Sequence, residues 1–189
     1  AYEIFLRELV GAGNSVIVPT PAYMPFLSVP KLYDVDVIEI EMLQSGDAET
    51  GEAQWVFDFD AIERAFAAGC HAFVLCNPHN PIGKVLTLEE ELRLSDLAAQ
   101  YDVRIFNDEI HAPFVFEGKH IPFPTISEQA ALQSMTATSA SKSFNIPGTK
   151  CAQVLLTNPA DRDMWAVKAE WSEHQTATIG AIATTTAYN

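Results

Sequence analysis

The sequence predicts an α/β fold in which helices cover both faces of a mostly parallel β-sheet. Short and almost continuously apolar segments, such as residues 15–18 and 72–76, alternate with longer segments of helical periodicity, such as residues 87–100. Strands of this kind are buried on both faces, which is typical of parallel sheets in layered α/β domains. With 189 residues and no internal repeat or low-complexity linker, the chain has the size of one domain with a substantial core.

The first third of the chain contains clear helix boundaries. Gly11 and Gly13 follow an amphipathic segment and can end a helix, and Asp58 or Asp60 can cap the next one. Residues 44–54 are polar and contain glycine, which favours a surface loop. The elements expected here are a helix over 2–10, strands over 15–18 and 31–40, the loop over 44–54 and a helix from about 58 to 68.

A capping box predicts the start of the next helix. Thr87 precedes Glu90 by three residues, and helical periodicity continues from there to Gln100. The run Glu89-Glu90-Glu91 is interpreted as a solvated helix start that the helix dipole favours. The buried side of this helix is expected to hold Leu88, Leu92, Leu94, Leu97 and Ala98. The other elements expected are strands over 72–76, 103–107, 135–139 and 153–157, a helix from Pro159 to about Glu173 and a last helix from Thr178 onward.

Composition and charge argue against several classes of partner. The net charge of −14 would repel nucleic-acid phosphates, so no nucleic-acid partner is expected. No apolar run reaches the length of a membrane span and no signal peptide is recognised, so no membrane partner is expected. The odd number of cysteines (Cys70, Cys76 and Cys151) favours reduced, buried thiols in a cytoplasmic protein. No second ligand pair completes a zinc site around Cys70 and His71 or around Cys76 and His79, so no metal is expected.

One lysine lies where covalent chemistry is favoured. Lys142 follows the strand predicted at 135–139 and stands among four hydroxyl residues, namely Thr138, Ser139, Ser141 and Ser143. The amine is expected to be poorly solvated there, and a desolvated lysine can lose its proton near neutral pH and attack a carbonyl. The small hydroxyl side chains can hold an anionic group such as a phosphate. Taken alone, the same lysine also fits an ordinary solvated strand end.

The strand at 72–76 ends in a loop with two Asn-Pro steps. Asn77-Pro78 and Asn80-Pro81 lie within five residues, and Gly83 follows them. Proline fixes its own φ and restricts the residue before it, so the loop is expected to be rigid. A rigid loop would aim the Asn77 amide at a fixed point, although the same residues also fit an ordinary turn.

The strand that begins near Val103 ends in two carboxylates and a histidine. Asp108 and Glu109 are adjacent, and His111 follows two residues later. Neighbouring side chains alternate between the faces of a strand, so only one of the two carboxylates can face a site. Open α/β sheets bind ligands at the carboxyl ends of their strands, which makes Asp108 a candidate site residue.

Taken together, these motifs resemble the aspartate-aminotransferase superfamily of pyridoxal-phosphate (PLP) enzymes, and within it the MalY/PatB-type cystathionine β-lyases. The segments that carry the resemblance are Asn-Pro-His-Asn-Pro at 77–81, Asp-Glu-Ile-His at 108–111 and Ser-Lys-Ser-Phe-Asn at 141–145, with 19–26 and 120–123 fitting the same branch. The resemblance covers essentially all of the chain. It implies PLP as the cofactor, a homodimer, and the three-layer large domain of the aspartate aminotransferase fold type.

The resemblance also implies how residues 1–189 relate to the whole enzyme. The glycine-containing phosphate loop of the family is expected before residue 1, and the small domain with the arginine that binds the substrate carboxylate is expected after residue 189. Residues 1–189 are therefore expected to be a PLP-binding large domain that is truncated at both ends.

The resemblance assigns roles to individual residues. Lys142 is implied as the lysine that carries PLP and then moves the α-proton, and Asp108 as the carboxylate that keeps the pyridine nitrogen protonated. Lys150 stands where many aminotransferases have a phosphate-binding arginine, and lysine supplies the charge without the two-pronged geometry. The other implied cofactor contacts are Asn77 at the phenolic oxygen, Tyr23 stacked on the ring, Ser139 and Ser141 at the phosphate, and His111 where aminotransferases usually carry tyrosine.

The implied reaction is β-elimination from L-cystathionine or a related S-substituted cysteine, which yields pyruvate, ammonia and a thiol. An aminotransferase on the same fold is the first alternative, because it would use the same asparagine, aspartate and lysine. A catalytically silent regulatory or binding module is the second alternative. A Rossmann-type nucleotide-binding domain is disfavoured, because no G-x-G-x-x-G motif follows any predicted strand.

Overall fold

The structure is a computed structural model that describes residues 1–46 and 53–189. Its main sheet has the strand order β2-β1-β5-β6-β7-β8. The first five of these strands run parallel to their neighbours, and β8 pairs antiparallel with β7 at the edge. The mostly parallel sheet predicted from the sequence is confirmed. The strands are β1 Ser15–Thr20, β2 Asp36–Glu41, β5 Ala72–Cys76, β6 Arg104–Asp108, β7 Ser134–Thr138 and β8 Gln153–Leu156.

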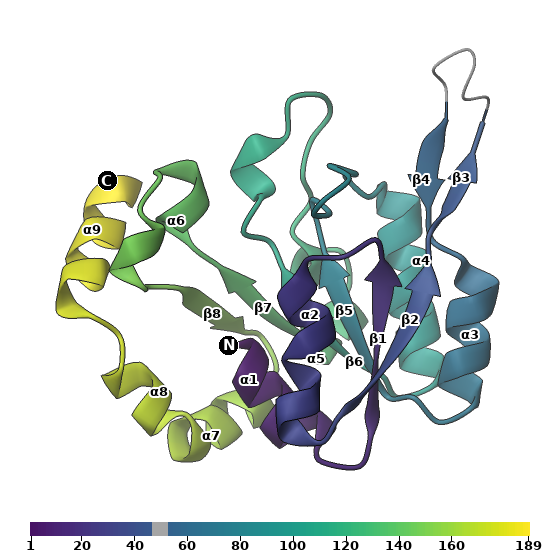
Figure 1. Cartoon of the computed structure of the whole chain (residues 1–189), viewed down its shortest axis with the longest axis horizontal. Helices are drawn as coiled ribbons and strands as arrows, with labels where there is room; N and C mark the ends of the chain where they lie inside the picture. The colour runs from purple at the N-terminus through teal and green to yellow at the C-terminus, as the bar shows by residue number, and fades with distance from the viewer. Residues whose placement is uncertain (47–52) are drawn as a thin grey trace.

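Helices lie on both faces of this sheet (Figure 1). The α-helices are α1 Tyr2–Ile4, α2 Met24–Ser28, α3 Phe59–Ala67, α4 Leu88–Gln100, α5 Glu128–Gln133, α6 Ala140–Ser143, α7 Pro159–Lys168, α8 Glu170–His174 and α9 Thr178–Tyr188. A π-helix at Phe5–Val10 continues α1, and short 3-10 helices occupy Pro30–Tyr33, Ala112–Phe114, Phe123–Thr125 and Pro147–Thr149.

The core is divided by the sheet into two apolar layers, because successive strand residues point to opposite faces. On β5, Phe73 and Leu75 pack in the layer formed with α3, α4 and α5. Val74 and Cys76 pack in the other layer, formed with the N-terminal helices, α2 and α7. The predicted three-layer arrangement is therefore confirmed, and a small cavity lies where β5 and β6 end.

The predicted helix caps are confirmed where side chains satisfy the first backbone N–H groups. Asp58 accepts the N–H of Ala61 at 2.9 Å and begins α3. Thr87 and Glu90 form the reciprocal capping box of α4, with distances of 3.2 and 2.9 Å. The helix predicted from 2 to 10 is also present, although its second half is the π-helix.

Several predictions about secondary structure and burial were wrong. The strand expected over 31–40 begins only at Asp36, because a 3-10 helix occupies Pro30–Tyr33. The expected surface loop at 44–54 contains parts of two strands, β3 Leu43–Ser45 and β4 Gln54–Val56, which pair antiparallel; positions 47–52 lie outside the described residues. The single helix expected from 159 to 173 is interrupted at Ala169, which ends α7 and begins α8. Leu88 and Leu92, expected in the core, are 46% and 36% exposed, because α4 turns other residues toward the sheet.

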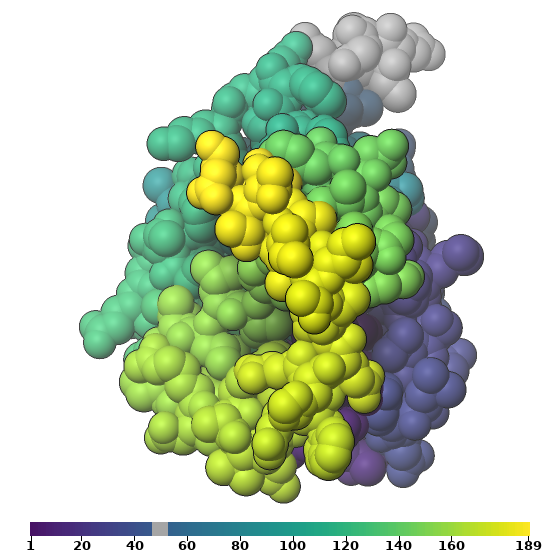
Figure 2. Space-filling view, turned by 90° about the vertical axis from the view of Figure 1, so that its left-hand side faces the viewer, coloured from purple at the N-terminus to yellow at the C-terminus, as the bar shows by residue number. Residues whose placement is uncertain are grey.

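The C-terminal helix covers the segment that contains Lys142. Figure 2 shows α9 lying across the chain around α6, and the two helices are in contact. Gly180 lets α9 also pack against the 3-10 helix Pro147–Thr149, because a Cβ atom there would collide with the carbonyl oxygen of Thr149. In the described part of the chain, no helix is both long and apolar enough to cross a bilayer.

Candidate active site

Four of the predicted site residues meet at one small cavity. The cavity has a volume of about 70 Å³ and lies where β5 and β6 end. Tyr23, Asp108, His111 and Lys142 all line it, although they come from three separate segments of the sequence, with Asp108 and His111 in the same one. The remaining lining residues are Phe26, Cys76, Asn80 and Ile110. Titratable groups thus converge at the sheet edge where α/β proteins bind ligands.

Lys142 lies in the four-residue helix α6, directly after β7. Ser139 begins this helix: its hydroxyl accepts the N–H of Ser141 at 3.0 Å and donates to the carbonyl of Cys151 at 2.7 Å. The lysine is exposed, which corrects the expectation of a poorly solvated amine. The short helix projects Lys142 into the cavity mouth instead of enclosing it among hydroxyl groups.

Ser139 and Ser141 do not line the cavity. The Ser139 hydroxyl already makes two hydrogen bonds within the protein, so its capping role accounts for its position. Lys150 is exposed and lines a different hollow, together with Ala1 and Trp165. The structure therefore does not bring the two predicted phosphate contacts, Ser139 and Ser141, into the Lys142 cavity, and Lys150 also lies outside it.

Asp108 supplies a carboxylate to the cavity. Its Oδ1 accepts the N–H of Ile110 at 3.0 Å. Burial raises the pKa of Asp108 to about 6, and the neighbouring Glu109 charge adds to that increase, whereas the Ile110 N–H and the positive charge of Lys142 oppose it. A cationic group placed against this carboxylate would favour its ionised form.

Glu109 faces away from the cavity, as strand alternation predicts. Its Oε1 accepts from Asn107 Nδ2 at 2.7 Å and from the N–H of Phe123 at 2.8 Å. Its Oε2 lies 3.3 Å from His120 Nε2. The prediction that only one of the adjacent carboxylates faces the site is confirmed. Glu109 instead binds the backbone at the start of the 3-10 helix Phe123–Thr125.

His111 contributes an imidazole to the wall of the cavity. Burial lowers its pKa, and so does the positive charge of Lys142, while a hydrogen bond with the backbone of Pro78 acts in the opposite direction. The ring is therefore neutral near neutral pH. Within the described residues its Nδ1 atom has no hydrogen-bond partner.

Tyr23 contributes an aromatic ring to the lining of the cavity. It immediately precedes α2, and its ring packs edge-on against Phe26 with centroids 5.6 Å apart. The ring is 45% exposed, so part of its surface remains available to a flat ligand. Phe26 anchors it to the apolar layer beneath.

Asn77, predicted as a cofactor contact, is fully buried and does not line the cavity. Its Nδ2 donates to Glu91 Oε1 at 2.6 Å, and its Oδ1 accepts the N–H of Leu86 at 3.1 Å. The second asparagine of the motif, Asn80, lines the cavity instead. The sequence signal for Asn80 was the repeated Asn-Pro step, which offers two candidate amides. The amide of Asn80 is farther from the end of β5 than that of Asn77 and is therefore freer to reach a ligand.

A wider hollow adjoins the cavity. Its volume is about 300 Å³, and it shares Asn80 and His111 with the cavity. His79, Phe114 and Phe116 contribute imidazole and aromatic surface to it. The two spaces together could hold a ligand that has one reactive end and one apolar extension.

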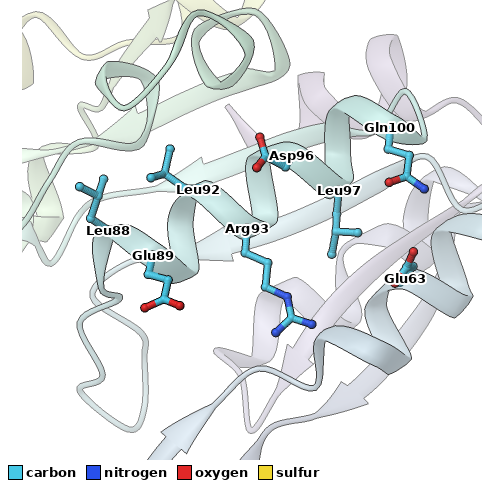
Figure 3. Close-up of a pocket in the computed structure, with 8 residues that line it drawn as sticks. All are labelled: Glu63, Leu88, Glu89, Leu92, Arg93, Asp96, Leu97 and Gln100. Atoms are coloured by element: carbon cyan, nitrogen blue, oxygen red, sulfur yellow. The ribbon is translucent and has the colours of Figure 1, made fainter.

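A larger hollow, a groove of about 670 Å³, lies along α4 (Figure 3). Leu88, Leu92 and Arg93 of α4 and Glu63 of α3 are among its lining residues. It shares no residue with the Lys142 cavity. We place the site at the smaller cavity, because the lysine, carboxylate and imidazole converge there. Across residues 1–46 and 53–189, no three histidine, cysteine or acidic side chains are grouped as metal ligands.

Comparisons with known proteins identify the family of the chain. Residues 3–188 match the family model for aminotransferase class I and II. The chain is 40% identical to cystathionine beta-lyase of Corynebacterium glutamicum, a match that covers 99% of this chain and 48% of that protein. It is 30% identical to cystathionine beta-lyase PatB of Bacillus subtilis, over 86% of this chain and 41% of that protein.

A solved structure gives the same result in three dimensions. The crystal structure of a putative PLP-dependent beta-cystathionase from Corynebacterium diphtheriae superimposes with a TM-score of 0.88 at 37% identity, covering 100% of this chain and 47% of that one. The chain thus spans about half the length of the relatives that it matches. On the family match and these relatives, the chain belongs to the aminotransferase class I and II family.

Proposed function

We propose that this chain is the PLP-binding large domain of a carbon–sulfur lyase, which eliminates the β-thiol group of L-cystathionine or a related S-substituted cysteine. The products would be pyruvate, ammonia and a thiol. The observation that carries the proposal is the convergence of Lys142, Asp108 and His111 on one cavity. The names of the similar proteins, which are cystathionine beta-lyases, support the choice of reaction.

The residues of the cavity suit PLP. Lys142 is exposed and can form a covalent bond with an aldehyde. Asp108 can hold a protonated ring nitrogen, since its Oδ2 has no hydrogen-bond partner within the described residues. Tyr23 offers part of its ring face, and Asn80 takes the role in hydrogen bonding that the sequence assigned to Asn77. When bound, PLP would supply the electron sink that makes the α-proton of an amino acid removable.

Each residue then has a defined task in the elimination. The Nζ atom of Lys142 takes the α-proton, and the electron pair released from that C–H bond expels the β-thiolate. Asp108 stays ionised against the protonated ring nitrogen and holds that proton in place. His111, neutral in this environment, borders both the cavity and the wider hollow, where it can hydrogen-bond the leaving thiol.

The decisive experiment uses the full-length protein with PLP and L-cystathionine. Pyruvate and free thiol are compared with keto-acid-dependent amino transfer from the same substrate. Elimination is expected to exceed transamination. Transamination faster by about tenfold, a barrier difference of about 1.4 kcal/mol, would replace this proposal with the aminotransferase alternative. Cofactor binding without either product would indicate a catalytically silent binding module.

We also propose that the enzyme is a cytoplasmic homodimer. The three cysteines are free, which suits a reducing compartment. Met24 and Phe116, which flank the site, are 76% and 92% exposed, and an apolar surface of this kind suits contact with a second subunit. Light scattering of the full-length protein tests the assembly. Wild type is expected to have the mass of a dimer and Phe116→Asp a lower mass, and a monomeric mass for wild type would contradict the proposal. Cell fractionation tests the location.

A further inference from the structure

The three consecutive glutamates at the start of α4 have three different environments. Glu89 is exposed to solvent. Glu90 completes the capping box and pairs with Lys84 Nζ at 2.8 Å. Glu91, by contrast, is 0% exposed, which corrects the expectation that the whole run is solvated. A buried carboxyl group is costly unless a polar partner compensates it, so its partner indicates what it does.

The partner of Glu91 is the Asn77 amide, which joins three segments near the site. Asn77 Nδ2 donates to Glu91 Oε1 at 2.6 Å, and Asn77 Oδ1 accepts the N–H of Leu86 at 3.1 Å. The backbone N–H of Asn77 donates to the carbonyl of Asp108 at 3.0 Å. The side-chain amide of Asn77 therefore ties the start of the loop 77–86 to its end and to α4, and the backbone of the same residue ties it to the end of β6. Asn80, which lines the Lys142 cavity, lies within the loop that this amide closes.

We propose that Glu91 is a positioning residue of the site: it fixes the Asn77 amide, which closes the loop 77–86 and so sets the place of Asn80 at the Lys142 cavity. The proposal rests on the proposed function only for the nature of the ligand that Asn80 meets. Glu91 itself lies outside the cavity and acts through Asn77.

The charged groups around Glu91 are consistent with this role. His120 favours its ionised form, whereas Glu109 and Glu90 oppose it. Lys84 is engaged with Glu90. Among the described residues, Glu91 Oε2 has no hydrogen-bond partner, so the bond to Asn77 is the polar contact that accounts for the burial of this side chain. The Oε1 atom can accept from Asn77 in either protonation state.

Hydrogen exchange in the cofactor-free, full-length protein provides the first test. Glu91→Leu leaves the Asn77 amide unpaired, so exchange of the Leu86 N–H is expected to accelerate by about tenfold relative to amides of β5. Glu91→Gln keeps an acceptor oxygen and is expected to restore the wild-type rate. Glu89→Leu makes the same change in the same helical turn at an exposed position, and is expected to have no effect on Leu86. If Glu91→Leu does not fold, Glu91→Met replaces it, because a flexible side chain adapts more readily to the space.

PLP affinity of the same variants provides the second test. The Kd for PLP is expected to rise by about tenfold in Glu91→Leu and to return to the wild-type value in Glu91→Gln. Unchanged exchange at Leu86 in Glu91→Leu would overturn the proposal. So would faster exchange with an unchanged Kd, because Glu91 would then be structural only. If wild type does not bind PLP at all, the proposed function falls, and the exchange data alone decide whether Glu91 fixes the loop.

Discussion

Asp108 and Glu109 are adjacent in the chain, yet their carboxylates lie on opposite sides of the end of β6. Asp108 lines the Lys142 cavity, whereas Glu109 binds the N–H of Phe123 and lies beside His120. Because neighbouring side chains of a strand alternate in direction, Asp108 faces the cavity while Glu109 binds the backbone of a loop. The two residues should respond to substitution in different ways.

Asp108→Asn should retain the fold and lose about 100-fold or more in lyase activity. The asparagine Oδ1 can still accept the Ile110 N–H, so local packing is preserved. A neutral amide cannot hold the ring nitrogen of the cofactor in its protonated form. The measurement pairs turnover of L-cystathionine with the thermal unfolding midpoint, and near-normal turnover would refute the assigned role. Asp108→Ala is less informative because it also creates a void.

Lys142 should be the residue that PLP modifies. Borohydride reduction of the holoprotein, followed by peptide mapping, should place the label on the peptide that contains Lys142. Lys142→Arg keeps the positive charge but lacks a nucleophilic amine, so it should abolish both the label and turnover. Lys150→Arg is the matched control, because Lys150 is also exposed yet lies outside the cavity. Label at another lysine in wild type would contradict the assignment.

Glu91→Gln should stabilise the protein increasingly as the pH rises. Burial raises the pKa of Glu91 to about 7 from its ordinary value of 4.5. Between these pH values the folded state retains a proton that the unfolded state has lost, so wild-type stability falls across this window and then levels off. Gln does not titrate, and its advantage should grow to about 3 kcal/mol near pH 8. Urea unfolding of wild type and Glu91→Gln from pH 4 to pH 8 measures the difference between their free energies of unfolding. A difference that does not change with pH would show that the buried carboxyl does not titrate as described.

Breaking the ion pair between Arg104 and Asp161 should destabilise the fold. Arg104 Nη1 donates to Asp161 Oδ1 at 3.0 Å and Arg104 Nε to the carbonyl of Gln133 at 3.0 Å, which ties β6 to α7 and α5. Arg104→Met leaves the Asp161 carboxylate buried without its partner and should cost about 3 kcal/mol in urea unfolding. The double variant Arg104→Met with Asp161→Leu should recover most of this loss. Additive losses would mean that the two groups are not coupled.

Gly180→Ala should weaken the attachment of α9. The added methyl group would collide with the Thr149 carbonyl, and overpacking of this kind costs about 1–3 kcal/mol. Gly148→Ala is the matched control, because a Cβ atom there has no neighbour within 4 Å among the described residues. Urea unfolding compares the two variants. Equal stability would show that α9 can shift at no cost.

The parts of the fold that the sequence predicted are those where local and tertiary preferences agree. β5 is apolar at every position and buried at every position, so its pattern could only be a central strand. The caps at Asp58 and Thr87 are formed within one turn of their helices and need no distant partner. Lys142 and Asp108 were predictable for a related reason, since each follows a strand whose end faces the ligand edge.

The parts that the sequence did not predict depend on which of several equivalent residues turns inward. Glu89 and Glu91 have the same chemistry, and only the rotation of α4 decides that Glu91 meets Asn77 while Leu88 and Leu92 remain exposed. The choice between Asn77 and Asn80 has the same origin. Both precede proline, and only the position of α4 shows that the first amide is already bonded.

The two Asn-Pro steps have a consequence for the chemical ageing of the protein. Spontaneous deamidation of asparagine begins when the backbone nitrogen of the next residue attacks the side-chain carbonyl. Proline has no N–H group, so Asn77 and Asn80 are protected from that route by Pro78 and Pro81. Deamidation of Asn80 would place a second negative charge in the cavity beside Asp108. The loop therefore removes this route to an additional negative charge at the cavity.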